Sequence, residues 1–236
     1  MSRVLVISDI HSNYDALESV LLENFDYLLI SGDLVDYGPE PHKVIDEIKD
    51  KSDFIVIGNH DSANAFNIDC RCSEKFHDLS VYTRNFYKRL ISNDQIKFLR
   101  SLPLFKNFEI DGVRFTMVHA SMTDYLYDYV LPTIGDEDLV KKFKNSESDF
   151  VIFGHTHLPM VRRIKSTVYV NPGSVGQPRD GDWRTSYAII DTNEKSYFIK
   201  RIKYDLETTV QKINSMDMEI NKKETLIKIL RKGESP

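Results

Sequence analysis

The chain has 236 residues, of which 41% are hydrophobic and 28% charged, as is usual for a water-exposed globular protein. Its formal net charge of −5 argues against binding that depends on neutralising nucleic-acid phosphates, so we expect no stable nucleic-acid partner. No stretch approaches the roughly 20 apolar residues that span a bilayer, so no membrane association is expected. Residues 1–236 are predicted to form a single domain.

The first residues and the cysteines indicate a cytoplasmic location. The first apolar run, Val4–Ile7, is too short for a signal peptide and is soon followed by Asp9. The two cysteines, Cys70 and Cys72, are too few for the disulfide framework of a secreted protein. A Cys-x-Cys pair can bind a soft metal, or it can be two loop thiols with no special role.

Short strands and amphipathic helices alternate in the first quarter of the chain. Strands are predicted at Arg3–Ser8, Tyr27–Ser31 and Asp53–Ile57, and helices at Tyr14–Glu23 and Pro41–Lys49. This alternation predicts a parallel sheet with helical crossovers.

The rest of the chain changes from helices to strands and back. Residues Ser80–Ser101 are predicted to be helical, and Ser92 with Gln95 forms a capping-box signature for the second helix of this stretch. A hairpin is predicted at Phe105–Ile110 and Val113–Val118, around Asp111-Gly112. Further strands are predicted at Phe150–Phe153, Met160–Lys165, Thr167–Val170, Tyr187–Asp191 and Ser196–Lys203, and a helix or helix pair at about 206–231. The expected fold is α/β, with one large sheet or two packed sheets covered by helices.

Each early strand is followed by residues that can bind metal. The sequences are Asp9-Ile10-His11, Gly32-Asp33 and Gly58-Asn59-His60-Asp61, and two later strands are followed by His119 and by His155-Thr156-His157. In parallel α/β sheets the loops at the carboxyl ends of the strands meet in one crevice. Five of the seven histidines directly follow an apolar strand, which predicts a functional site rather than scattered side chains.

The residue types favour two divalent metal ions. Imidazole and carboxylate groups without cysteine suit Mn²⁺ first, with Fe, Zn²⁺, Ni²⁺ or Mg²⁺ as alternatives. Seven candidate ligands exceed what one tetrahedral ion needs, so two ions that share a carboxylate are expected. Such a pair activates a water and binds both oxygens of a phosphoryl displacement.

These five motifs, in this order, resemble those of the calcineurin-like metallophosphoesterase superfamily, particularly its compact bacterial and archaeal phosphodiesterase-type members. The resemblance implies a sandwich of two mixed β-sheets with flanking helices. It assigns Asp9, His11 and His157 to one metal, Asn59, His119 and His155 to the other, and Asp33 to both. It makes His60 the catalytic donor to the leaving oxygen, which a neighbouring carboxylate, Asp61 or Asp9, would keep protonated.

The stretch after Asp33 distinguishes this chain from two groups of the superfamily. Tyr37 stands where the serine/threonine protein phosphatases have a phosphate-binding arginine, and Asp36 stands where purple acid phosphatases have a tyrosine ligand. Tyr37 is instead a candidate for substrate contact, and Arg179, in the turn-rich segment from Asn171 to Gly181, is a candidate phosphate ligand.

The expected activity is hydrolysis of small phosphodiesters, including nucleotides, by a hydroxide that bridges the two metals. Alternatives within the enzyme class are a phosphomonoesterase and a dinucleoside-polyphosphate hydrolase, since substrate choice depends on the loops. A different class, a non-catalytic protein-binding scaffold with this fold, would not need His60 or every ligand. The amphipathic C-terminal segment leaves self-association into a homo-oligomer open.

Overall fold

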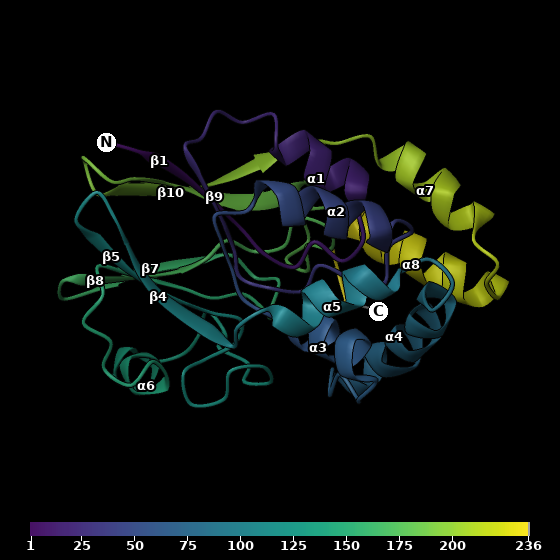
Figure 1. Cartoon of the computed structure of the whole chain (residues 1–236), viewed down its shortest axis with the longest axis horizontal. Helices are drawn as coiled ribbons and strands as arrows, with labels where there is room; N and C mark the ends of the chain where they lie inside the picture. Colours follow the sequence, from purple (N-terminus) through teal and green to yellow (C-terminus); the bar gives the residue numbers. More distant parts are fainter. Residues whose placement is uncertain (236) are drawn as a thin grey trace.

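Two five-stranded sheets form the centre of the protein. We describe a computed structural model that covers residues 1–235 (Figure 1). The first sheet consists of β1 (Arg3–Ile7), β2 (Tyr27–Ile30), β3 (Phe54–Ile55), β9 (Thr185–Asp191) and β10 (Ser196–Ile202). Its strand order is β10-β9-β1-β2-β3. Strands β1, β2 and β3 run parallel, β9 pairs antiparallel with β1, and β10 pairs antiparallel with β9.

The second sheet is also mixed. It consists of β4 (Phe105–Ile110), β5 (Val113–Val118), β6 (Phe150–Ile152), β7 (Met160–Ile164) and β8 (Thr167–Asn171). The order is β4-β5-β6-β8-β7, with hairpins at both edges and parallel pairing on either side of β6. The carboxyl ends of the parallel strands in both sheets point toward the middle of the molecule along its longest axis (Figure 1).

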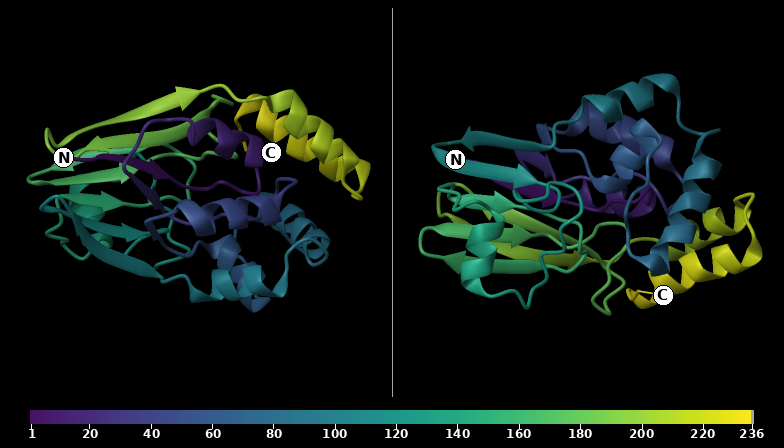
Figure 2. Two further views of the ribbon diagram at one scale, coloured as in Figure 1. Left: turned by 45° about the horizontal axis from the view of Figure 1, so that its top comes forward. Right: turned by 90° about the horizontal axis from the view of Figure 1, so that it is seen from below.

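Residues 1–235 contain eight helices outside the sheets. They are α1 (Tyr14–Val20), α2 (Pro41–Lys51), α3 (Asn59–Phe66), α4 (Glu74–Tyr87), α5 (Asn93–Ser101), α6 (Asp136–Lys142), α7 (Leu206–Ser215) and α8 (Ile220–Lys232). The strands occupy one half of the molecule, and α4, α7 and α8 occupy the other (Figure 2). None of the described helices is long and apolar enough to cross a membrane.

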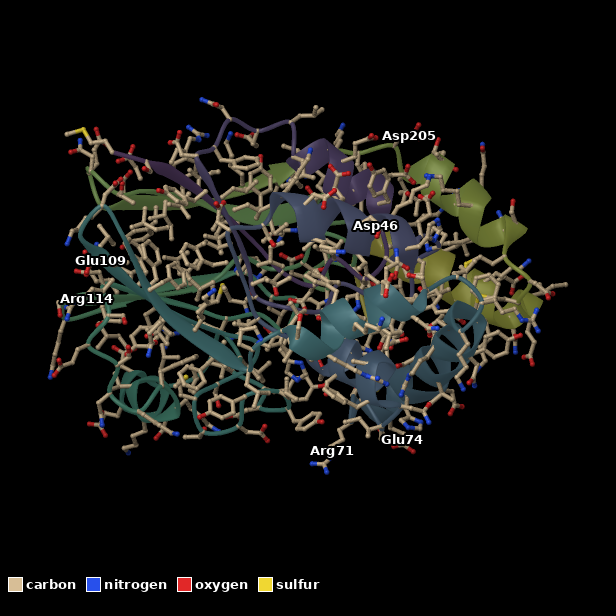
Figure 3. The ribbon with its side chains drawn as sticks, viewed as in Figure 1. Asp46, Arg71, Glu74, Glu109, Arg114 and Asp205 are labelled. Carbon is tan, nitrogen blue, oxygen red and sulfur yellow. The ribbon has the colours of Figure 1, made fainter. Side chains whose placement is uncertain are left out.

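Alternation along the strands produces the layers. On β1, Val4 and Val6 face the second sheet, whereas Leu5 and Ile7 pack against α1 and α2. The second sheet buries its other face under α6. Charged side chains such as Glu109, Arg114 and Asp205 lie at the periphery (Figure 3). The result is a helix–sheet–sheet–helix sandwich, so the predicted fold class is confirmed.

The hairpin of β4 and β5 has its predicted bounds, and the other predicted strands lie within two residues of those observed. The capping box is also confirmed, because Ser92 and Gln95 exchange hydrogen bonds of 2.9 and 3.2 Å. The C-terminal segment is a helix pair rather than one helix. That residues 1–236 act as a single domain stays a prediction.

Three helical stretches were not predicted. Helix α3 starts on the motif residue Asn59, α4 starts at Glu74 rather than at Ser80, and α6 lies where the sequence predicts no helix. Helix α3 begins with four polar residues, and α6 buries only Leu139, so neither shows an apolar stripe. Tertiary contacts rather than local periodicity hold these helices in place.

A substitution between the sheets tests this packing. Phe115 is buried with the rings of Phe108 and Phe150 at 5.2 and 5.4 Å between centroids. We expect Phe115→Ala to lower the free energy of unfolding by about 3–5 kcal/mol, because it leaves a cavity in a close-packed layer. Urea denaturation measures this change. Phe198→Ala, at a ring 41% exposed on β10, should change it by less than about 0.5 kcal/mol; equal losses would contradict the assigned layers.

Candidate metal centre

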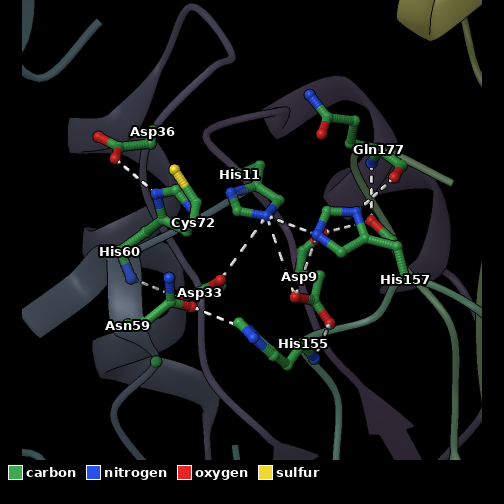
Figure 4. A network of polar contacts seen from close by, with 12 residues as sticks. Asp9, His11, Asp33, Asp36, Asn59, His60, Cys72, His155, His157 and Gln177 are labelled. Carbon is green, nitrogen blue, oxygen red and sulfur yellow. Dashed lines mark hydrogen bonds and ion pairs between the residues drawn. The ribbon is translucent and has the colours of Figure 1, made fainter. Parts of the chain in front are cut away.

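The loops after five strands bring the seven predicted metal ligands together. Asp9 and His11 follow β1, Asp33 follows β2, Asn59 follows β3, His119 follows β5, and His155 and His157 follow β6. Figure 4 shows most of these side chains pointing toward a common centre. None of the seven is more than 4% exposed, so the centre is almost completely buried.

Sharp turns hold most of these residues. Five of the seven have a positive φ, between 47° and 68°: Asp9, His11, Asp33, His155 and His157. Asp, Asn and His tolerate this left-handed region better than most residues, but it still costs energy. The protein accepts this backbone strain where it directs side chains inward.

Asp9, His11 and His157 form the first group, in which one ligand atom of each lies within 4.8 Å of the others. Each histidine donates from Nδ1 to a backbone carbonyl, His11 to Val35 at 2.9 Å and His157 to Gln177 at 2.6 Å. The two Nε2 atoms therefore carry lone pairs, and they lie 3.1 Å apart. Asp9 Oδ1 is 3.4 Å from Nε2 of His157 and has no hydrogen-bond partner among the described residues.

The second group has the same construction. His119 donates from Nδ1 to the carbonyl of Ser31 at 2.6 Å, which turns the Nε2 lone pair inward. This Nε2 is 3.0 Å from Asn59 Oδ1 and 3.3 Å from Asp33 Oδ2. Asn59 donates from Nδ2 to the carbonyl of Cys70 at 2.8 Å, so its amide oxygen must face the group.

His155 and Asp33 complete and connect the groups. Nδ1 of His155 lies 3.1 Å from Asn59 Oδ1, and its Nε2 is buried without a partner in the described part of the chain. Asp33 Oδ2, already close to His119, is also 3.8 Å from Nε2 of His11 in the first group. A single carboxylate oxygen therefore lies within reach of both groups.

The residues present fit divalent cations. In the first group, Asp9 Oδ1 and the Nε2 atoms of His11 and His157 face one another with no hydrogen to share, which is unfavourable in a buried site unless a cation lies between them. Burial holds the pKa of His11 and His157 well below its usual range, so both are in the neutral form that binds metal. Burial alone would lower the pKa of His119, but Asp33 and Asp9 outweigh it and raise the pKa to about 9. The carboxylates thus favour positive charge here.

His60 is paired with Asp36. His60 donates from Nδ1 to Asp36 Oδ2 at 2.7 Å, and Ser80 donates to the same oxygen at 2.9 Å. Asn64 donates to the other carboxylate oxygen at 2.8 Å. Burial alone would lower the pKa of His60, but the charges of Asp33 and Asp36 and the Asp36 hydrogen bond raise it to about 9.

The expectation that Asp61 or Asp9 pairs with His60 was wrong. Asp61 instead accepts from the backbone N–H groups of Asp33, Leu34 and Gly58 at 2.8, 2.8 and 3.0 Å. It supports the loop that carries Asp33. From the sequence, Asp36 stands out only because purple acid phosphatases have a tyrosine at this position, three residues after Asp33. Its positive φ of 74° is not predictable from the local sequence.

Tyr37 lies inside the site and is only 1% exposed. Its ring centroid is 4.8 Å from that of His11 and 5.0 Å from that of His60, and its hydroxyl lies 3.3 Å from Nε2 of His60. The ring is therefore packed between site residues rather than open for stacking by a base. Its role as a substrate contact stays a prediction.

Arg179 brings a positive charge close to the centre. Its guanidinium lies 3.8 Å from the ring centroid of Phe76 on α4, and Nη2 donates to Gln177 Oε1 at 2.7 Å. Its Nε is buried and unpaired within residues 1–235. Burial raises the pKa of Asp9 to about 6, and the charges of His119 and, more weakly, Arg179 oppose this rise. Arg179 is therefore within electrostatic reach of the first group.

Two glycines allow the groups to form. A Cβ on Gly58 would lie 2.0 Å from Asp33 Oδ1, and one on Gly154 would lie 2.0 Å from Ser8 Oγ and 2.8 Å from Asp9 Oδ2. Any side chain at these positions would displace a carboxylate of the site. The Gly-Asn-His and Gly-His motifs therefore need glycine for space.

Comparisons with known proteins identify the family of this chain. The family model for the calcineurin-like phosphoesterase superfamily domain matches residues 2–195. The chain is 31% identical to the uncharacterised protein MJ0912 of Methanocaldococcus jannaschii, over 90% of this chain and 92% of the relative. It is 24% identical to serine/threonine-protein phosphatase 2 of Escherichia coli, over 75% of this chain and 90% of that protein. It is 23% identical to phosphodiesterase YfcE of the same species, over 82% and 89%.

A solved structure shares the whole fold. The crystal structure of a metallophosphoesterase from Sphaerobacter thermophilus superposes with a TM-score of 0.82 and 26% sequence identity, and the match covers 98% of each chain. The similarity therefore includes the C-terminal helices that the family model does not cover.

Gly58→Ala tests how the site depends on Asp33. We expect the variant to bind divalent ions about tenfold or more weakly, because the new methyl group displaces the carboxylate between both groups. Metal content after reloading and dialysis measures this. Gly135→Ala is the matched control, since a Cβ there meets nothing within 4 Å. Equal metal content in both variants would contradict the assigned position of Asp33.

Proposed function

The chain belongs to the calcineurin-like phosphoesterase superfamily and is a hydrolase of ester bonds, and we propose that it hydrolyses small phosphodiesters with two divalent metal ions. The observation that carries this proposal is the meeting of two groups of buried acceptor atoms at Asp33 Oδ2. A structural role does not explain the first group, whose buried acceptors are unfavourable without a cation.

The proposed ligand sets follow the two groups. Asp9, His11 and His157 would hold one ion, Asn59, His119 and His155 the other, and Asp33 both. When bound, such ions polarise a phosphoryl oxygen and lower the pKa of a bound water. The backbone carbonyls of Val35, Ser31 and Gln177 fix the tautomers that this binding requires.

His60 is proposed to donate a proton or a hydrogen bond to the leaving oxygen. Asp36 holds the ring through Nδ1, so Nε2 is the nitrogen available to substrate. The contact of Nε2 with the Tyr37 hydroxyl is long at 3.3 Å, so a substrate oxygen can replace it at little cost. With its pKa raised to about 9, His60 is protonated at neutral pH.

Arg179 is proposed to bind the substrate phosphate. Its Nε is buried without a partner among the described residues, and a non-bridging phosphate oxygen would satisfy it. The stack on Phe76 holds the guanidinium plane in position.

The buried centre supports a small substrate. His60 and His155 are only 3% and 4% exposed, so a long polymer would have little surface to follow near the reacting group. The net charge of −5 also gives a nucleic acid no general attraction. Similarity to YfcE favours a diester, and Tyr37 in place of a phosphate-binding arginine agrees with this choice. Similarity to a protein phosphatase makes a phosphomonoesterase the second candidate.

A protein-binding scaffold has less support. The site keeps both acceptor groups together with the His60–Asp36 pair, which a scaffold does not need. Manganese as the native metal and a cytoplasmic location stay predictions from the sequence.

A paired substrate assay tests the activity. Metal-stripped protein reloaded with Mn²⁺ should hydrolyse an aryl phosphodiester faster than the matching aryl phosphomonoester, at equal metal content. No turnover of either substrate with metal bound would contradict the enzymatic proposal. Faster monoester turnover would replace the diesterase proposal with the second candidate.

Asp36→Asn tests whether Asp36 keeps His60 protonated. The protonated ring is the donor, so the rate should fall as pH rises through the His60 pKa. Asp36 raises that pKa, and its removal should move the alkaline limb of the kcat/KM profile to lower pH. The loss of rate at neutral pH should be largest for poor leaving groups.

His60→Ala removes the proposed donor itself and so gives the largest loss of rate expected in this experiment. It should lower the rate about 10²-fold or more while keeping both metal ions, because His60 is not a proposed ligand. An unshifted alkaline limb in Asp36→Asn, or loss of metal in His60→Ala, would contradict these roles.

A further inference from the structure

Two thiols lie beside His60, apart from both acceptor groups. Cys70 and Cys72 flank Arg71, and their sulfur atoms lie 2.8 Å apart. Cys70 is buried and Cys72 half-buried, with Cys72 next to the ring of His60 in Figure 4. The segment is braced, because Asn59 donates to the Cys70 carbonyl at 2.8 Å.

The three side chains can share one ion. One ligand atom from each of Cys70, Cys72 and His60 lies within 4.8 Å of the other two. Zinc bonds measure about 2.3 Å to sulfur and about 2.0 Å to nitrogen, so small movements would bring all three atoms into one coordination sphere. An open fourth position would remain for water.

The two kinds of site differ in chemical preference. Thiolate ligands select soft, thiophilic ions, whereas the oxygen and nitrogen groups around Asp33 also suit harder ions such as Mn²⁺. We propose that Cys70, Cys72 and His60 form a separate binding site for a thiophilic divalent ion of the zinc class, and that its occupancy inhibits the enzyme.

Inhibition follows from the use of His60. A histidine that binds an ion cannot carry protons on both nitrogens. An ion on Nε2 would occupy the nitrogen proposed to face the leaving oxygen, and an ion on Nδ1 would replace the hydrogen bond to Asp36. The Ser80 hydroxyl lies 3.3 Å from Cys70 Sγ, 2.9 Å from Asp36 Oδ2 and 3.3 Å from His60 Nδ1, so movement of the thiol also disturbs the pair. Two thiolates would offset the charge of an ion placed near the other centre. The inhibition rests on the proposed function, but the binding does not.

Cadmium is a suitable probe, because its thiolate complexes absorb in the ultraviolet. The chain has two cysteines, so any such band must come from Cys70 and Cys72. We expect Cd²⁺ added to Mn²⁺-loaded, fully reduced protein to produce a band that saturates at one ion per chain while turnover falls. Cys70→Ser and Cys72→Ser should each require about tenfold or more Cd²⁺ for half-inhibition, relative to the uninhibited rate of the same variant.

Two histidine variants locate the third ligand. His60→Gln should keep the sulfur band but require about tenfold or more Cd²⁺ to saturate it. His77→Ala is the matched control, since His77 bonds the exposed Asp69 at 3.0 Å and lies outside the cluster. Its saturation should match that of the unsubstituted protein.

Three outcomes would overturn the proposal. They are the absence of a sulfur band, a saturated band with undiminished turnover, and equal inhibition of the unsubstituted protein and both cysteine variants. If the protein hydrolysed no phosphoester at all, the band and its dependence on His60 would still test the site. Failure of the proposed function and failure of this inference can therefore be distinguished.

Discussion

The carboxylate of Asp33 joins the parts of the site through both oxygens. Oδ1 accepts from the backbone N–H of His60 at 2.9 Å, at the beginning of α3, and Oδ2 faces Nε2 of His119 and of His11. The positive end of the α3 dipole favours this charge. Asp61 holds the backbone of Asp33 in place, and Gly58 leaves room for its side chain. Loops from both sheets therefore depend on one carboxylate.

The cost of burying so many acceptors explains why this arrangement points to function. Lone pairs that face one another in a dry interior destabilise the folded chain unless a cation lies between them. Ions that bind only the folded protein add to its stability by mass action. The five strained backbone positions add a further cost, which the packed sheets on either side can support.

His60 is where the proposed chemistry and the thiol pair meet. Asp36 and Ser80 support one side of the ring, Tyr37 contacts the other, and Cys72 lies close by. The centre around Asp33 contains only oxygen and nitrogen ligands, whereas the adjacent cluster contains two sulfurs. Ions of different softness can therefore act at neighbouring positions on one reaction.

Features that depend on local patterns could be predicted from the sequence. The hairpin of β4 and β5, the Ser92 cap and most strands could be predicted because alternation, turn residues and capping act over a few neighbours. The order of the strand-end motifs was sufficient to predict which residues would gather. The way in which these residues meet depends on contacts between distant segments. The tertiary structure pairs His60 with Asp36, starts α3 on Asn59 and brings the thiols to His60, because positive-φ turns and contacts between distant segments set side-chain directions.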